Sequence, residues 1–245
     1  MLYFIRIVAI VLFVALGGLI GLILCLVRPF HRDNIFDTAR FFKLGLKILG
    51  IKVRVQGEFP DPKKGPYVYI SNHQENMDVF IGAHLIPRDT VTIGKRDIIF
   101  IPFFGLFYAL SGNILINRQN KKEAFGAMDK ALSQMKSKAI SVWILPEGTR
   151  SKGRGLLPFK KGAFHLALKG QYPVVPVAIS FFKHLDLNRL ESGTIMVEIM
   201  DPITIDHSYF TEVNLLRDHS YQLIANSLQQ MDRELDEQKK IAARK

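Results

Sequence analysis

A chain of 245 residues with a hydrophobic fraction of 48% can bury one good core, and its formal net charge of +11 predicts an anionic partner. The apolar content, with 18 phenylalanines, favours a membrane surface over nucleic acid. The single cysteine, Cys25, excludes a disulfide framework and a cysteine metal site within one chain, which suits a reducing, cytoplasm-facing domain.

The first predicted element is an uncharged run from Ile7 to Val27, bracketed by Arg6 and Arg28. At a rise of about 1.5 Å per residue, a helix over this run extends about 31 Å, enough to cross the hydrocarbon core of a bilayer. The run is too long for the apolar region of a signal peptide, and no Ala-x-Ala site follows it. We therefore expect an uncleaved, membrane-embedded helix. The excess of Lys and Arg after it predicts that the C-terminal part lies in the cytoplasm.

A second helix is predicted from Asn34 to Leu49, ended by Gly50. It is basic and rich in phenylalanine, and we expect it at the membrane interface, with packing on the domain as the alternative. Residues 1–49 thus form a predicted membrane-anchoring segment, and residues 50–245 a separate globular domain.

From Ile51 onward, strand-like and helix-like patterns alternate, which is typical of an α/β fold. We predict a mixed, largely parallel sheet covered by helices on its faces. Strands are expected at Ile51–Val55, Tyr67–Ile70, Val91–Ile93, Asn113–Ile116, Ile140–Leu145, Val174–Ile179 and Ile195–Ile199, and helices at Asp78–Leu85, Lys121–Lys136, Gly162–Lys169 and Leu215–Arg233.

A second uncharged stretch, Ile98 to Asn117, is about long enough to span a bilayer. Pro102, Gly105 and Gly112 interrupt it, and its aromatic residues suit an interface or an apolar binding groove. If it spanned the membrane, the residues before it and after it would face opposite compartments and could not build one site.

One turn between a predicted strand and helix holds His73 and Asp78. Histidine is suited to accept a proton near neutral pH, and a carboxylate on its other ring nitrogen fixes the tautomer. A straight helix does not pair residues five apart, so the two can meet only if His73 lies in the turn and Asp78 in the first helical turn. Ser71 and Asn72 would shape the turn. The alternative is a capped helix with a solvated histidine.

Polar and basic residues follow several predicted strands where each one ends. Glu147-Gly148-Thr149-Arg150 comes after Ile140–Leu145, and the arginine fork suits phosphate. A carboxylate is out of place in a phosphate site unless Glu147 pairs with an arginine or accepts from a substrate hydroxyl. Taken alone, the tetrapeptide favours an ordinary turn. The recurrence of basic residues at strand ends predicts a concave positive site, formed by Lys95, Arg96, Arg118 and Arg150 with Lys152, Arg154, Lys160 and Lys161.

Other chemistries find little support in the sequence. It contains no nucleophile elbow, P-loop or dinucleotide-binding fingerprint. The remaining histidines are scattered without metal-ligand spacing, so no metal site is predicted. No nucleic-acid module is recognisable, and we expect no nucleic-acid partner.

Asn72-His73 with Asp78, followed by Glu147-Gly148-Thr149-Arg150, resembles the glycerolipid acyltransferase family with its HxxxxD motif. Within that family the chain is most similar to bacterial 1-acyl-glycerol-3-phosphate acyltransferases. The resemblance runs over nearly the whole chain, and the two motifs in this order and spacing are specific, whereas either alone is weaker.

The resemblance implies a role for each matching residue. His73 would be the general base and Asp78 its orienting partner. Gly112, Ile116 and Arg118 match a second block, with Leu115 where the family usually has phenylalanine, and Pro176 matches a fourth block of structural or acyl-chain role. The substrate's glycerol phosphate would be held by Arg118, Glu147, Gly148, Thr149 and Arg150, with Lys95 as a looser match and Arg96 as its alternative.

The implied reaction transfers a fatty acyl group from acyl-CoA or acyl-carrier protein to the sn-2 hydroxyl of lysophosphatidic acid, giving phosphatidic acid. It needs no cofactor and no metal, only the thioester co-substrate. The implied location is the bacterial inner membrane, with the catalytic domain in the cytoplasm. Three alternatives stay open: an enzyme of the same family with another acceptor, such as glycerol-3-phosphate; a lipid hydrolase; and a non-catalytic tether to anionic membranes.

Overall fold

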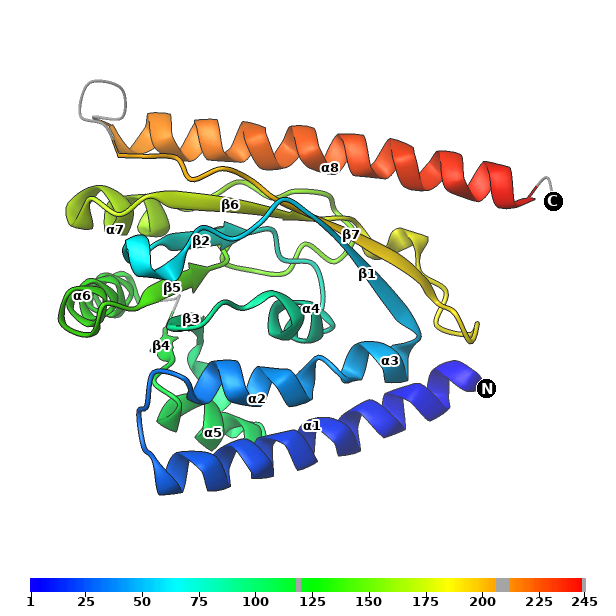
Figure 1. Cartoon of the computed structure of the whole chain (residues 1–245), viewed down its shortest axis with the longest axis horizontal. Helices are drawn as coiled ribbons and strands as arrows, with labels where there is room; N and C mark the ends of the chain where they lie inside the picture. Colours follow the sequence, from blue (N-terminus) through cyan, green and yellow to red (C-terminus); the bar gives the residue numbers. More distant parts are fainter. Residues whose placement is uncertain (118–119, 206–211, 244–245) are drawn as a thin grey trace.

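A computed structural model describes residues 1–117, 120–205 and 212–243, and its centre is a seven-stranded sheet of order β1-β7-β6-β2-β5-β3-β4 (Figure 1). β7 runs antiparallel to β6, and the other paired strands are parallel. The predicted mixed, largely parallel α/β fold is therefore confirmed. The strands are β1 (Ile51–Gln56), β2 (Val68–Ser71), β3 (Thr90–Lys95), β4 (Ile114–Ile116), β5 (Ser141–Ile144), β6 (Val174–Ile179) and β7 (Gly193–Ile199).

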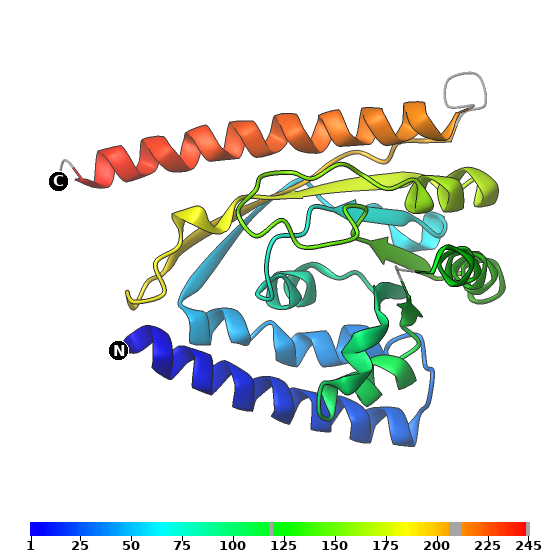
Figure 2. The same cartoon turned by 180° about the vertical axis from the view of Figure 1, so that it is seen from behind.

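Helices cover both faces of the sheet, which explains why its central strands are apolar on both sides (Figures 1 and 2). Alternate residues of one strand enter different cores: Val68 and Ile70 of β2 pack on one face, whereas Tyr69 packs on the other. The first face carries α6 (Lys121–Lys138), α7 (Gly162–Gly170) and α8 (Val213–Ala243). The other carries α4 (Asp78–Leu85), with α2 (Asn34–Phe42) and α3 (Gly45–Leu49) beneath it and α1 (Leu2–Val27) and α5 (Phe104–Leu110) outermost.

The N-terminal helix α1 begins earlier than the predicted apolar run and contains Arg6. This arginine lies inside the helix and is only 6% exposed. Its guanidinium donates to Ser192 Oγ at 2.7 Å and to the carbonyls of Leu187, Arg189 and Leu190 at 2.8, 2.6 and 2.7 Å. The charge is satisfied by the loop after the short 3₁₀ helix Phe182–His184, so the start of α1 is attached to the domain.

The segment predicted as one helix, Asn34 to Leu49, forms two helices, with Lys43 and Leu44 between them. Gly50 ends the second helix in a left-handed conformation (φ +67°), as the sequence predicted. The apolar face of α2 packs on α1 and α4, which is the alternative that the sequence left open. Phe42 is 3% exposed, and its ring lies 5.5 Å from that of Phe104.

The second uncharged stretch does not span a membrane. It includes the end of a 3₁₀ helix (Arg96–Phe100), the short α5 and the edge strand β4. Among the described residues only Leu2–Val27 is a helix long and apolar enough to cross a bilayer. α5 lies directly against α1, where a Cβ atom added to Gly18 would lie 2.6 Å from the backbone nitrogen of Phe104. The glycine of α1 therefore allows the two helices to pack closely. Because Ile98 to Asn117 forms short elements packed on α1, the prediction that this stretch does not span the membrane is confirmed.

The outer faces of α1 and α5 remain exposed and apolar. Such a large apolar surface on one side of a protein marks a contact with another apolar phase. On α1 it includes Phe4, Val11, Leu12, Leu16, Ile23, Leu26 and Val27, and around α5 it includes Phe100, Ile101, Phe103 and Leu106.

Candidate active site

The loop between β2 and α4 brings His73 and Asp78 together. Asp78 is the first residue of α4, and its Oδ2 atom lies 2.5 Å from Nδ1 of His73. The same oxygen accepts the backbone N–H groups of Gln74 and Glu75 at 2.6 and 3.1 Å. Asp78 therefore holds the backbone of the loop before α4 and orients the imidazole with the same oxygen. A proton on Nδ1 leaves the lone pair on Nε2, the nitrogen that would accept a proton from a substrate.

Glu147 lies beneath this loop rather than in a phosphate site. It is 3% exposed; Oε1 accepts the backbone N–H of His73 at 2.6 Å, and Oε2 accepts that of Leu157 at 3.0 Å. Burial raises the pKa of this carboxyl, while the bonds from His73 and Leu157 act in the opposite direction. Because both oxygens already accept backbone donors, the expected phosphate contact of Glu147 is corrected to a supporting contact behind His73.

Backbone bonds join the two sequence motifs. The N–H of Ser151 donates to the carbonyl of His73 at 2.8 Å, and that of Lys152 donates to the carbonyl of Gln74 at 3.1 Å. In addition, the guanidinium of Arg150 donates to the side-chain oxygen of Asn76. The loop after β5 therefore pairs with the loop after β2, and Arg150 lies beside the His73–Asp78 turn.

Gly148 and Thr149 occupy the turn between these contacts. Gly148 has φ +69°, and an added Cβ would lie 2.8 Å from Cε of Lys160, so both the backbone and the space favour glycine. Thr149 is exposed. The lysine stem covers the turn on which the predicted phosphate ligands lie.

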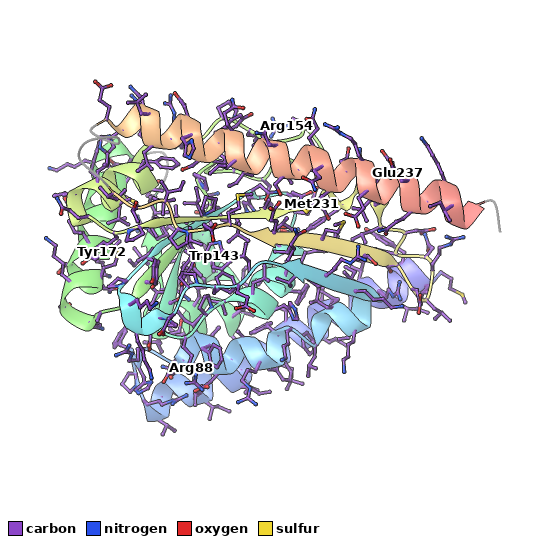
Figure 3. The ribbon with its side chains drawn as sticks, turned by 45° about the horizontal axis from the view of Figure 1, so that its top comes forward. Arg88, Trp143, Arg154, Tyr172, Met231 and Glu237 are labelled. Atoms are coloured by element: carbon purple, nitrogen blue, oxygen red, sulfur yellow. The ribbon has the colours of Figure 1, made fainter. Side chains whose placement is uncertain are left out.

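Side-chain amides connect the His73 loop to the end of β6, a feature that the sequence did not reveal. Asn72 donates to the carbonyl of Ile179 at 2.8 Å and accepts its N–H at 2.9 Å. Gln74 bonds to the same strand end, although its partners lie more than a hundred positions later in the chain. On the opposite side, the indole N–H of Trp143, in the interior of the molecule (Figure 3), donates to Ser71 Oγ at 2.9 Å.

The other predicted phosphate ligands are less closely connected to His73. β2, β5, β3 and β4 are neighbours and parallel, so their C-terminal ends share one edge of the sheet. Lys95 ends β3 and pairs with Asp97, while Arg96 lies 3.7 Å from Glu123. Within the described part of the chain, neither cation bonds to the His73 loop. Arg118 lies outside the described residues.

Exposed basic residues follow the turn along the chain. The chain has no acidic residue between Glu147 and Asp186. The cations of the loop before α7 carry no ion pair within the described ranges, and four of them are exposed: Lys152, Arg154, Lys160 and Lys161. This site can therefore combine proton transfer at His73 with the attraction of a phosphate or another anion.

Comparisons with known proteins identify the family to which the chain is similar. Residues 52–180 match the family model described as Acyltransferase. The 1-acyl-sn-glycerol-3-phosphate acyltransferase of Escherichia coli is 36% identical over 238 residues, covering 97% of this chain and 97% of that protein. The protein of the same name from Haemophilus influenzae is 34% identical over 238 residues (96% and 98% covered), and the one from Saccharomyces cerevisiae is 37% identical over 215 residues (84% and 71% covered).

The fold also has a solved counterpart. The crystal structure of the 1-acyl-sn-glycerophosphate (LPA) acyltransferase from Thermotoga maritima superposes with a TM-score of 0.74 at 20% sequence identity, covering 94% of this chain and 95% of the other. At this identity the likeness concerns the fold alone.

Proposed function

The chain belongs to the acyltransferase family, and we propose that it is a 1-acyl-sn-glycerol-3-phosphate acyltransferase that converts lysophosphatidic acid to phosphatidic acid. The proposal rests on the His73–Asp78 pair, held at 2.5 Å beside a basic turn. The names of relatives that cover nearly the whole chain support this choice of acceptor.

The reaction follows from the position of Nε2. His73 removes the proton of the sn-2 hydroxyl as its oxygen attacks the thioester carbonyl of the donor. The tetrahedral intermediate then collapses, the carbon–sulfur bond breaks, and the imidazolium returns the proton to the leaving thiolate. Such general base catalysis contributes about 10²–10⁴-fold in rate. Asp78 stabilises the imidazolium through Nδ1, and no acyl-enzyme is needed because one site holds both reactants.

The acceptor phosphate would bind on the basic side of the same turn. Arg150 is the first candidate, because its guanidinium already lies beside Asn76 of the His73 loop. Its planar fork suits bidentate phosphate binding. Lys160, over Gly148, supplies a second charge. Arg118 and one of Lys95 or Arg96 complete the set by the family resemblance.

The N-terminal helices would hold the enzyme against the membrane. α1 packs on α2, α3 and α5, and Arg6 attaches its first turns to the domain. If α1 crossed the bilayer upright, the polar loop that surrounds Arg6 would enter the hydrocarbon as well, which is unfavourable. We therefore infer that α1 lies along the membrane surface with its exposed apolar face in the lipid. The catalytic domain would face the cytoplasm of a bacterial cell, where acyl-CoA or acyl-carrier protein supplies the acyl group.

A panel of acceptors tests the proposed function. Purified protein is incubated with an acyl-CoA or an acyl-carrier protein and with lysophosphatidic acid, glycerol-3-phosphate or lysophosphatidylcholine. We expect phosphatidic acid from lysophosphatidic acid as the main product. Preference for another acceptor would reassign the substrate, release of free fatty acid without an acceptor would indicate a hydrolase, and no turnover with any pair would favour the tether.

A further inference from the structure

Gln74, directly after His73, is 4% exposed and uses its whole side chain for hydrogen bonds. Its amide nitrogen donates to the carbonyls of Ile179 and Ser180 at 3.1 and 3.0 Å. Its amide oxygen accepts the N–H of Phe182 at 3.1 Å. The side chain thus lies along the main chain where it leaves β6 and bonds to three of its backbone groups.

The backbone of Gln74 makes two more connections. Its N–H donates to Oδ2 of Asp78 at 2.6 Å, the oxygen that also holds the ring of His73. Its carbonyl accepts the N–H of Lys152 at 3.1 Å. One residue therefore joins the start of α4, the basic turn after β5 and the end of β6.

We propose that Gln74 is a positioning residue for acyl transfer, a role that rests on the proposed function. The side-chain amide of Gln74 fixes the position of the His73 loop relative to the end of β6. Its backbone N–H bonds to the same Asp78 oxygen as the imidazole and so fixes the direction of the ring. A displacement of about 1 Å at a reacting group can cost about 10²-fold in rate, so a modest shift of this loop reduces turnover.

The neighbouring Asn72 separates positioning from folding. Its paired bonds to the backbone of Ile179, at 2.8 and 2.9 Å, hold the first part of the loop on β6, and although Gln74 shares the carbonyl, these two bonds do not need the Gln74 side chain. The loop therefore stays attached to β6 when the Gln74 side chain is replaced. Loss of the Gln74 bonds then changes the position of His73 and leaves the fold intact. A buried amide that only stabilised the fold would instead lower the unfolding midpoint without a specific effect on turnover.

Two substitutions at this position test the role. Gln74→Met keeps the length of the side chain and removes all three bonds. Gln74→Glu keeps the shape but turns an acceptor oxygen toward the carbonyls of Ile179 and Ser180, which a carboxylate cannot satisfy.

Two further variants are controls. Gln238→Met makes the same chemical change as Gln74→Met on the exposed face of α8. Leu228→Ala truncates a side chain that is 2% exposed in the core under α8, and so supplies a destabilised variant with an unchanged loop.

The experiment measures kcat, KM for lysophosphatidic acid, KM for acyl-CoA and the thermal unfolding midpoint of each full-length variant, with kinetics run below every midpoint. We expect Gln74→Met to lower kcat by about 10–100-fold with both KM values within about threefold, and Gln74→Glu to lower it further. Leu228→Ala and Gln238→Met should keep kcat within about twofold of the wild type. The proposal is overturned if Gln74→Met keeps wild-type kcat, if its loss lies only in KM, or if Leu228→Ala loses as much.

A second readout does not depend on the acceptor. Diethyl pyrocarbonate modifies accessible imidazoles, and the rate at His73 is followed by peptide mass spectrometry. Gln74→Met should change this rate by about threefold or more, whereas Leu228→Ala should leave it unchanged. If the wild type fails to acylate lysophosphatidic acid, the proposed function fails, and this rate still decides the role of Gln74. Equal rates in the wild type and Gln74→Met contradict it.

Discussion

The Oδ2 atom of Asp78 lies 2.5 Å from Nδ1 of His73 across a separation of five residues. A continuous helix would place these side chains on different faces. The contact forms because His73 lies in the loop after β2, whereas Asp78 opens α4 and accepts the N–H groups of that loop. Closure of the loop before α4 and orientation of the imidazole are therefore two effects of one carboxylate.

Asp78→Asn tests the orienting role. The amide keeps the size of the side chain but removes the charge that stabilises the imidazolium and favours the Nδ1–H tautomer, so kcat should fall by about 10²–10⁴-fold. KM for lysophosphatidic acid should change little, because Asp78 contacts His73 and the loop backbone, whereas the proposed phosphate contact is Arg150. Steady-state kinetics at neutral pH give both values. A variant with full turnover would show that the pair is a helix cap and no more.

Glu147→Gln tests the contact behind His73. Burial raises the pKa of Glu147 in the folded protein, so between its ordinary value and the raised value the folded state retains a proton that the unfolded state has lost. The contribution of Glu147 to stability is therefore complete below its ordinary pKa and declines as the pH rises through the raised one. The stability of the wild type relative to Glu147→Gln should fall with rising pH in that window.

Thermal unfolding of both proteins across the acidic range measures this difference. The variant should also lose turnover by about tenfold, because an amide nitrogen facing a backbone N–H disturbs the position of His73. A stability difference that is constant or grows with pH would contradict the assignment.

Arg150→Ala tests the phosphate contact. Hydrogen bonds to charged groups contribute about 1.5–3 kcal/mol, so KM for lysophosphatidic acid should rise by about 10–100-fold while KM for acyl-CoA stays near the wild-type value. Lys169→Ala makes the same change of charge on α7, where the lysine pairs with Asp129, and serves as the control. An unchanged acceptor KM, or an equal effect in both variants, would move the phosphate elsewhere.

The membrane arrangement is tested by labelling. Lys64→Cys and Lys152→Cys are made separately in a Cys25→Ser background, because Cys25 is the single cysteine of the chain. Both positions are exposed and lie on opposite sides, in sequence, of the apolar stretch Ile98 to Asn117. A membrane-impermeant maleimide should leave both unlabelled in intact spheroplasts and label both after permeabilisation. Labelling of one position alone in intact cells would refute a single cytoplasmic domain.

Much of this architecture follows from local patterns in the sequence. Val174–Ile179 and Asp78–Leu85 have the same bounds in the structure as in the prediction, because each is a clear apolar run with a recognisable end. The edge of the sheet that carries the site was also predictable, since it collects the ends of parallel strands.

The supporting contacts could not be found in the same way. Glu147 meets His73 across 74 positions, Gln74 meets Phe182 across 108, and Arg6 meets Arg189 across 183. Each of these side chains bonds to a backbone group. Every residue type carries a backbone N–H or carbonyl, so the type of the partner residue does not reveal the contact. The sequence therefore indicates which residues can do the chemistry, whereas the structure is needed to identify those that hold them in place.

The most direct test of the account is the acyl transfer activity of purified His73→Ala. The side chain is 18% exposed, and its removal leaves the backbone bonds of the loop to Glu147 and Ser151 in place, so the variant should fold with a near-normal unfolding midpoint. With lysophosphatidic acid and acyl-CoA, we predict a loss of phosphatidic acid formation of about 10²-fold or more. A folded His73→Ala protein that transfers acyl groups at a near wild-type rate would contradict the mechanism.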